Sequence, residues 1–422
     1  MDTGSTERPV RFIDLGLSKD LDQILTRLAF KTPTPIQEQA IPHALKGEDV
    51  IGIAQTGTGK TLAFALPMLQ TLNKSEGVGL VLVPTRELAN QVQEDIDRIG
   101  KRLGFKTILL VGGANMERQV RDLQRGPHII VATPGRLNDH IERKTARLNH
   151  VSVLVLDEAD RMLDMGFAPQ IDRILQSVPQ KRQTFLFSAT MPEAIAKIGR
   201  KYMRDPMQVE AAPPGTTAQN IEQGVYIVDS TNRFRLLQDL LEAHRGRPVL
   251  VFCRTKFGTK KMAHILHKEG FPCEELHSNR SLAQRKKALG EFKRGRAHIM
   301  VATDVAARGI DVKEIALVVN YDLPDQLEDY VHRIGRTGRA GHTGCAVSFV
   351  APTQMQELRT IERLAGEPIA VLEAPGTHSI QEVQALKERT APRAAHAPHR
   401  RVRPSQGRHR RDHHKHSPRR SR

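Results

Sequence analysis

One short segment of the sequence, AQTGTGKT at residues 54–61, has the residue types that bind phosphate groups. Gly57 and Gly59 allow backbone N–H groups to turn inward around an anion, and the N-terminus of a following helix adds partial positive charge. Lys60 can then reach the β- and γ-phosphates of a nucleoside triphosphate, and the Thr61 hydroxyl can bind Mg²⁺. The predicted nucleotide site comprises Ala54, Gln55, Thr56, Gly57, Thr58, Gly59, Lys60 and Thr61. Because alanine begins the segment where the general pattern has glycine, a simple turn before a core helix is the alternative.

A second group of reactive residues is the acidic tetrapeptide DEAD at 157–160, which follows the apolar run VSVLVL. Its carboxylates emerge where a buried strand ends, and ligands of α/β proteins bind at that end. Asp157 is placed to hold Mg²⁺, largely through water, and Glu158 to orient or deprotonate an attacking water. An isolated acidic tetrapeptide is more often a solvated turn, but its position after a phosphate loop and an apolar strand favours catalysis.

Both groups need a scaffold in which several buried strands end at one edge. Short apolar runs bounded by turn residues alternate with helical patterns, which is typical of an α/β fold with a parallel sheet covered by helices. The expected strands are 49–54, 80–83, 108–111, 129–132, 153–156 and 184–187, and then 249–252, 298–302, 317–320 and 345–349.

The chain divides near its middle. With 422 residues it is too long for one ordinary core, and the Pro-, Gly- and Thr-containing segment 210–223 is typical of a linker. LVLVPTR at 80–86 resembles VLVFCRT at 249–255, and IIVAT at 129–133 resembles IMVAT at 299–303 at nearly the same offset, which favours a duplicated domain. We predict an N-terminal extension at 1–40, a first domain at 41–210, a linker at 211–222, a second domain at 223–375 and a tail at 376–422.

The formal net charge of +17 is concentrated in the tail, where Pro392–Arg422 holds eleven Lys and Arg residues and one acid. The tail has few large apolar residues and cannot offset its ordering entropy, so we expect it to be disordered. It is either a solvated extension or an RNA tether whose affinity falls steeply with salt.

No apolar run approaches the length needed to span a bilayer, and the N-terminus lacks the pattern of a signal peptide. We therefore expect a cytoplasmic protein that does not bind membranes. The three cysteines, Cys253, Cys273 and Cys345, are too few and too widely spaced for a disulfide framework or a zinc site, and we expect core thiols.

With these motifs in place, residues 10–350 closely resemble the DEAD-box ATP-dependent RNA helicases, whose fold has two tandem RecA-like domains. FKTPTPIQ at 30–37 resembles the Q motif of that family. The resemblance implies that Gln37 reads both hydrogen-bonding edges of adenine and that Phe12 stacks on the base; a terminal amide can donate and accept together, which suits adenine. Ala29 stands where the family usually has glycine.

Three segments resemble the RNA-backbone motifs of the first domain: PTREL at 84–88, Gly112–Gly113 and TPGR at 133–136. Hydroxyl, N–H and Arg groups suit phosphate and ribose without reading sequence. The RNA-binding residues that the resemblance implies are Pro84, Thr85, Arg86, Gly113, Thr133, Arg136, Arg254 and Thr303. The segment SAT at 188–190 resembles the one through which the family couples hydrolysis to strand separation.

In the second domain, VATDVAARGID at 301–311 and HRIGRTGR at 332–339 resemble motifs V and VI. The resemblance implies that Arg336 and Arg339 are arginine fingers, which stabilise charge on the transferring phosphoryl group when the domains close. It also implies that Asp304 approaches the nucleotide, and that His332 and Arg333 contact the DEAD and SAT segments across the cleft. The implied coupling residues are Asp160, Ser188, Thr190, His332, Arg333 and Arg308.

Two residues of the second domain depart from the family pattern. Ser278 replaces a common glycine, and Leu282 replaces the glutamine of a Gln-x-x-Arg pattern whose arginine, Arg285, remains. RNA contacts at this edge are therefore less certain from sequence than the ATP site.

The resemblance implies a monomeric RNA-dependent ATPase that uses ATP and Mg²⁺ to unwind short RNA duplexes locally and to remodel ribonucleoproteins. Its expected partners are single-stranded and short duplex RNA, with ribonucleoprotein, RNA-decay or ribosome-assembly proteins. A DNA helicase of the same superfamily is one alternative, although the Q motif beside DEAD and SAT disfavours it. An ATP-independent RNA chaperone, supported by the basic tail, is the other.

Overall fold

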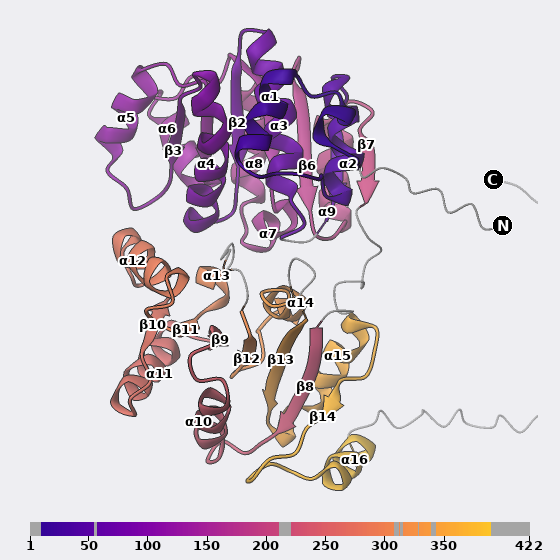
Figure 1. Cartoon of the computed structure of the whole chain (residues 1–422), viewed down its shortest axis with the longest axis vertical. Helices are drawn as coiled ribbons and strands as arrows, with labels where there is room; N and C mark the ends of the chain where they lie inside the picture. The colour runs from indigo at the N-terminus through magenta and orange to yellow at the C-terminus, as the bar shows by residue number, and fades with distance from the viewer. Residues whose placement is uncertain are drawn as a thin grey trace, which may run out of the picture.

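The chain folds into two α/β units placed one above the other (Figure 1). The computed structural model describes residues 10–54, 57–210, 221–307, 312, 315–327, 329–338 and 343–389. Each unit is built on a seven-stranded sheet, and every pairing between the named strands is parallel. The α/β class and the two parallel-sheet domains expected from the apolar runs are confirmed.

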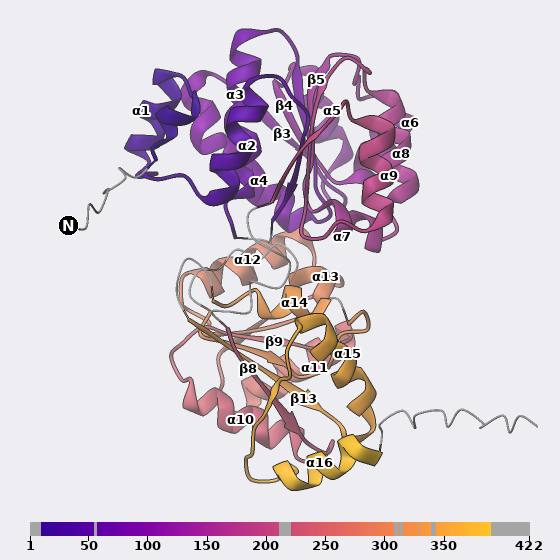
Figure 2. The same ribbon diagram turned by 90° about the vertical axis from the view of Figure 1, so that its right-hand side faces the viewer.

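The first sheet has the strand order β3-β4-β2-β5-β6-β1-β7. Its strands are β1 (Val50–Ile53), β2 (Val78–Leu82), β3 (Thr107–Leu110), β4 (Ile129–Ala132), β5 (Val151–Leu156), β6 (Gln183–Ser188) and β7 (Met207–Glu210). Its helices are η1 (Phe12–Leu15), α1 (Lys19–Arg27), α2 (Pro35–Leu45), α3 (Lys60–Lys74), α4 (Arg86–Gly100), η2 (Lys101–Leu103), α5 (Met116–Gln124), α6 (Pro134–Glu142), α7 (Ala159–Asp164), α8 (Ala168–Ser177) and α9 (Glu193–Tyr202). Figure 2 shows α1 to α4 on one side of this sheet and α6, α8 and α9 on the other, so an apolar cluster lies on each face.

The second sheet has the order β10-β11-β9-β12-β13-β8-β14, which repeats the first sheet strand for strand. Its strands are β8 (Ile221–Ile227), β9 (Val249–Phe252), β10 (Cys273–Leu276), β11 (Ile299–Ala302), β12 (Leu317–Asn320), β13 (Gly344–Val350) and β14 (Ala370–Val371). Its helices are α10 (Arg233–Ala243), α11 (Lys256–Lys268), α12 (Leu282–Lys293), α13 (Asp304–Ala307), α14 (Asp329–Ile334), η4 (Pro352–Gln354), α15 (Met355–Ala365) and α16 (Ile380–Arg389). The two sequence echoes fall on equivalent strands, β2 with β9 and β4 with β11.

Four strands were not predicted from sequence: β7, β8, β10 and β14. Three of them are the sheet edges β7, β10 and β14, and β8 lies beside an edge. Edge strands alternate polar and apolar residues or are very short, so they lack the continuous apolar run that marks a central strand.

The expected boundaries at both ends need correction. Phe12, Leu21 and Ile36 are buried in the same cluster as α3, so the segment expected as an extension packs into the first domain. The expectation of disorder from residue 376 is wrong for the described part of the tail, because α16 buries Val383 in the core of the second domain. Residues 390–422, and 211–220 of the expected linker, lie outside the described residues.

Among the described residues, no helix is both long and apolar enough to cross a membrane. All three thiols are free; Cys253 and Cys273 are buried, and Cys345 is half-buried. Burial raises the pKa of Cys273 to about 12, so this thiol stays protonated and unreactive.

Candidate active site

The phosphate loop joins the end of β1 to the start of α3. Gly57 and Gly59 have φ angles of 90° and 95°, in the left-handed region where glycine is favoured. Lys60 is 5% exposed, and its Nζ lies 4.0 Å from Asp157 Oδ1. The loop therefore brings a buried ammonium group to the end of β5, while residues 55 and 56 lie outside the described residues. The other described members of the predicted site are Ala54, Thr58 and Thr61.

Glu158 has the features of a catalytic carboxylate. It is 2% exposed, and neither carboxylate oxygen accepts a hydrogen bond from the described residues. Its backbone adopts φ 52° and ψ 50°, a left-handed conformation that is strained for a residue other than glycine. Arg161 Nε lies 3.8 Å from Glu158 Oε2. A buried, unsatisfied carboxylate in a strained turn is costly unless the site uses it, for example to hold a water.

Asp157 differs from its neighbour in its electrostatics. Burial raises the pKa of Asp157 to about 6, against the opposing effect of Lys60. One of its oxygens, Oδ1, accepts a hydrogen bond from Glu158 N at 3.0 Å. Lys60, whose Nζ lies 4.0 Å away, offsets part of this burial cost and favours the charged carboxylate.

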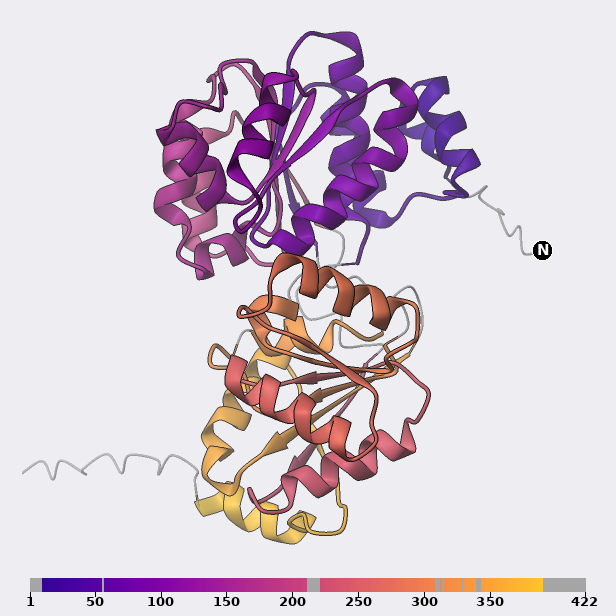
Figure 3. The same ribbon diagram turned by 90° about the vertical axis from the view of Figure 1, so that its left-hand side faces the viewer.

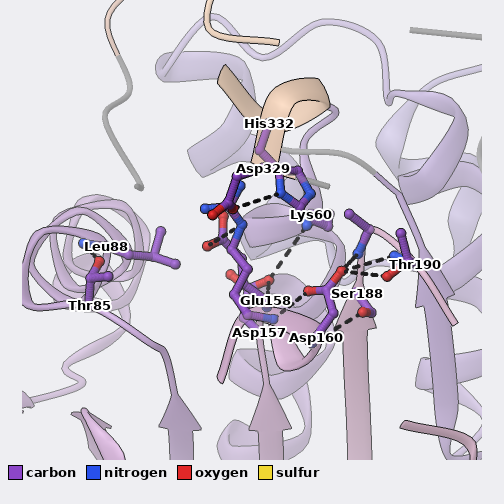
Figure 4. Close-up of polar contacts among 12 residues, drawn as sticks. Lys60, Thr85, Leu88, Asp157, Glu158, Asp160, Ser188, Thr190, Asp329 and His332 are labelled. Atoms are coloured by element: carbon purple, nitrogen blue, oxygen red, sulfur yellow. Dashed lines mark hydrogen bonds and ion pairs between the residues drawn. The ribbon is translucent and has the colours of Figure 1, made fainter. Parts of the chain in front are cut away.

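Asp160 links the acidic segment to the segment after β6. Its Oδ2 accepts hydrogen bonds from Ala189 N (3.0 Å), Thr190 N (3.0 Å) and Thr190 Oγ1 (3.1 Å), and its own N–H donates to Ser188 Oγ at 3.3 Å (Figure 4). Asp160 thus ties the acidic segment to residues 188–190 through four hydrogen bonds.

The second domain covers this cluster from above through α14, which carries His332 and Asp329 (Figure 4). His332 Nδ1 lies 3.8 Å from Asp329 Oδ1, and burial lowers the pKa of the imidazole. Burial raises the pKa of Asp160, but Lys60, His332 and Arg161 outweigh this effect and hold the pKa below its ordinary value. His332 therefore lies close enough to the acidic segment to affect the pKa of Asp160.

A pocket joins the two domains at this point. Arg336 is 2% exposed and donates from Nε to the His332 carbonyl at 3.1 Å. The pocket is lined by Arg161, Phe252, Asp304, Asp329, His332, Arg333 and Arg336. Two further predicted residues, Arg308 and Arg339, lie outside the described residues.

The expected role of Arg333 needs correction. Its guanidinium donates to both oxygens of Asp304, with Nη2 to Oδ2 at 2.7 Å, and to Asn320 Oδ1 at 3.2 Å. It also lies 4.9 Å from the centre of the Phe252 ring. All of these partners belong to the second domain, so within the described residues Arg333 joins motifs V and VI rather than reaching the DEAD or SAT segment. Asp304 was expected to approach the nucleotide, but in this structure both of its carboxylate oxygens accept hydrogen bonds from Arg333.

The Q-motif glutamine is bound to the phosphate loop. Gln37 Nε2 donates to the Gly59 carbonyl at 2.9 Å, and its Oε1 accepts from Thr34 N at 2.9 Å. A Cβ at Gly59 would lie 2.4 Å from Gln37 Nε2, so the contact itself requires glycine. Phe12, expected to stack on the base, is 2% exposed in the apolar core. Gln37 is therefore hydrogen-bonded to the phosphate loop, whereas the ring of Phe12 is enclosed by the apolar core and does not face an open base site.

The first-domain RNA motifs gather at the carboxyl ends of β2, β3 and β4. Thr85 caps α4 by accepting from Leu88 N at 3.2 Å (Figure 4). The guanidinium of Arg86 lies over Gly113, where an added Cβ would be 2.4 Å from Nη1. Pro84 precedes this cap, and Thr133 stands at the N-cap position of α6, after β4, without a capping hydrogen bond from its side chain.

Arg136 and Arg254 do not present free guanidinium groups. Arg136 Nη1 donates to the Ala114 carbonyl and to Gln119 Oε1, both at 3.0 Å, which fixes the loop after β3. Arg254 Nε lies 3.3 Å from Asp325 Oδ1, and its side chain is 42% exposed. Thr303 directly follows β11, at the carboxyl edge of the second sheet.

Sequence reasoning did not foresee a contact between α4 and α12. Arg285 Nη1 lies 3.0 Å from Glu87 Oε1, with side chains only 8% and 6% exposed. Leu282 packs against the apolar cluster of the first domain. The charge complementarity of Glu87 and Arg285 was visible in the sequence, but their proximity was not.

A magnesium ion fits this site by the chemistry of its donors. The described residues hold no group of three or more His, Cys, Asp or Glu that could bind a metal by themselves. Magnesium instead prefers one or two carboxylates, waters and phosphates. The Asp157 carboxylate and the Thr61 hydroxyl are oxygen donors of the kind that this coordination requires.

Several known proteins are similar to this chain in sequence and in fold. Residues 34–198 match the family model described as DEAD/DEAH box helicase, and 232–341 match the helicase conserved C-terminal domain. The DEAD-box ATP-dependent RNA helicase CshA of Bacillus cereus is 45% identical over 366 residues, or 86% of this chain and 70% of that protein. The ATP-dependent rRNA helicase RRP3 of Debaryomyces hansenii is 43% identical over 85% of this chain and 76% of that protein. The structure of S. cerevisiae Dbp5 bound to RNA and ADP BeF3 aligns with a TM-score of 0.78 at 31% identity, covering 90% of this chain and 99% of that one.

Proposed function

Because this chain belongs to the DEAD-box family of ATP-dependent RNA helicases, we propose that it couples ATP hydrolysis to local, non-processive unwinding of short RNA duplexes and to remodelling of RNA–protein complexes. The observation that carries this proposal is Glu158, a buried and unsatisfied carboxylate at the end of β5, covered by α14 of the second domain. Its position below α14, next to Arg161 of the pocket lining, suits chemistry that occurs only when both domains are engaged.

The first domain supplies most of the hydrolytic residues. Lys60 binds the β- and γ-phosphates, and Glu158 orients the attacking water and takes its proton. Mg²⁺, held by Thr61 and through water by Asp157, would neutralise charge on the phosphate oxygens. Gln37 exchanges one of its present bonds for the adenine edge, so base recognition is transmitted to Gly59 of the phosphate loop.

The second domain completes the site. Arg336 and Arg339 stabilise charge on the transferring phosphoryl group, and they can do so only when the cleft is closed. Asp160 passes the state of the nucleotide to Ser188 and Thr190 through its hydrogen bonds. ATP and RNA together favour the closed form, and hydrolysis removes that preference and releases the RNA.

Contacts to the RNA are made through its backbone. Pro84, Thr85, Arg86, Gly113 and Thr133 offer hydroxyl, N–H and guanidinium groups to phosphate and ribose. Arg136, Arg254 and Thr303 shape the same path, and Arg308 couples the two domains. Contacts to 2′-hydroxyls favour RNA over DNA. The eleven basic residues of Pro392–Arg422 form a tether that raises the local RNA concentration. The protein acts as a cytoplasmic monomer.

The test is steady-state ATP hydrolysis with single-stranded RNA, with single-stranded DNA and without nucleic acid. RNA should stimulate the wild type, and Glu158→Gln should lose about 10²- to 10⁴-fold of that rate. Glu193→Gln, an exposed acid of the same domain with its side chain 69% exposed, is the matched control. Stimulation by DNA and not RNA, or an unaffected Glu158→Gln, would overturn the proposal.

Truncation should be made after Arg389, because removing α16 would open the second core. The truncated chain should need more RNA for half-maximal stimulation and show a weaker dependence on salt. Unchanged RNA affinity would assign the tail to solvation alone.

A further inference from the structure

Phe257, near the start of α11, is unusually exposed for an aromatic residue. Its exposed fraction is 69%, against 42% for Val10, 40% for Met207 and 45% for Ile380, the other large apolar residues exposed among those described. Aromatic residues make up only 4% of the chain. A single exposed apolar side chain is common on protein surfaces, so the charges around this ring decide what it can bind.

The helix around Phe257 presents one basic face. Residues three, four and seven positions apart share a helix face, so Lys260, Lys261 and His264 lie beside the ring, and all three are exposed. The opposite face of α11 is buried through Thr259, Met262, Ala263 and Leu266. From Lys256 to Lys268 the helix carries four lysines and no acid. Figure 3 shows α11 on the outer surface of the second domain, with no described helix or strand over it.

Further cations extend this surface toward the RNA edge. Lys256 Nζ lies 5.4 Å from the centre of the Phe257 ring. Arg254, whose side chain is 42% exposed and paired with Asp325, precedes the helix at the end of β9. The aromatic ring is therefore flanked by lysines on a helix that follows the predicted RNA-binding residue Arg254.

We propose that the face formed by Phe257, Lys260 and Lys261 is a second binding site for single-stranded RNA, outside the cleft, in which the phenyl ring stacks on a base. This site rests on the proposed function, because it binds the continuation of the RNA held by the two domains. An acid-free helix complements a polyphosphate chain, and every base offers a π-face to the ring. The lysines neutralise neighbouring phosphates and release counterions.

The site would change how the protein selects RNA. Contacts within the cleft go to the backbone and are independent of sequence, whereas a stacking platform favours bases that stack strongly. A modest preference for purines at one position should result, without hydrogen-bond readout.

The chain contains no tryptophan, so Phe257→Trp creates a single fluorescent reporter at the site. Stacking of a base on the indole should quench its emission when single-stranded RNA binds in the presence of a non-hydrolysable ATP analogue. Ile380→Trp, on α16, is the matched control and should keep its emission. Equal responses of the two reporters would overturn the proposal.

Affinity gives an independent readout. Phe257→Ala should raise the RNA concentration for half-maximal ATPase by about five-fold or more, the lower end expected for one stacked base. Phe257→Tyr should restore the wild-type value, and RNA-free ATPase should not change. Replacing both lysines with glutamine should reduce the slope of log affinity against log salt by about 1.5.

The outcomes separate this site from the general function. If RNA fails to stimulate even the wild type, the proposed function fails. If RNA stimulates the wild type and Phe257→Ala equally, with no quenching of Phe257→Trp, the helicase assignment stands and the RNA site is wrong. That second result would assign the exposed ring to a protein partner.

Discussion

Neutralising the ion pair between α4 and α12 should open the cleft. Glu87 and Arg285 are 3.0 Å apart and almost fully buried, and removing one member of such a pair costs about 3–5 kcal/mol if the other stays buried. The domains can separate, however, and let water reach the remaining charge. We therefore expect the closed form to lose about 2 kcal/mol, which is about 30-fold in the ratio of closed to open protein.

The assay combines small-angle X-ray scattering of the free protein with the RNA concentration for half-maximal ATPase. Glu87→Gln and Arg285→Gln should each increase the radius of gyration and the RNA requirement. The double variant should be no worse than either single one, because the pair is already lost. Glu242→Gln is the matched control, since its pair with Arg245 is exposed and contributes little.

Two results would refute this reasoning. The first is a pair of single variants with unchanged compactness and RNA requirement, which would show that the pair adds nothing to closure. The second is strictly additive effects of Glu87→Gln and Arg285→Gln, because independent residues do not share an interaction energy.

Three further substitutions test other features of the structure. Ala29 has a φ of 62° at the end of α1, where Phe30 N donates to the Leu25 carbonyl. Because this left-handed conformation is strained for alanine, Ala29→Gly should raise the free energy of unfolding in denaturant by about 0.5–1 kcal/mol. A lower free energy of unfolding would contradict the strain. Leu282→Gln, which restores the usual family residue, should weaken closure by about 1 kcal/mol through lost apolar contact with the first domain, seen as a larger radius of gyration. Burial lowers the pKa of His332, so the unfolded chain binds the extra proton first as the pH falls below about 6.5, and stability should fall through that window. His332→Gln should reduce this acid-induced loss in thermal unfolding, and an identical pH profile would exclude the effect.

The sequence by itself determined the fold class and the positions of the reacting groups. Central strands such as 129–132, 249–252 and 317–320 were predicted with their observed bounds, because a strand buried on both faces is a continuous apolar run. The phosphate loop and the DEAD segment follow such strands, so their residues meet at one sheet edge wherever the sheet is parallel.

Only the tertiary structure decided which partner each polar group takes. Sequence suggested that Arg333 reaches across the cleft, but Asp304 and Asn320 lie within its own domain and satisfy its donors first. The edge strands and α16 were missed because neighbouring elements, and not their own composition, hold them in place. Glu87 and Arg285 are nearly 200 residues apart in sequence, and their ion pair depends on how the two domains meet. Local patterns therefore fix what a segment is, whereas contacts between distant segments decide what its side chains bind.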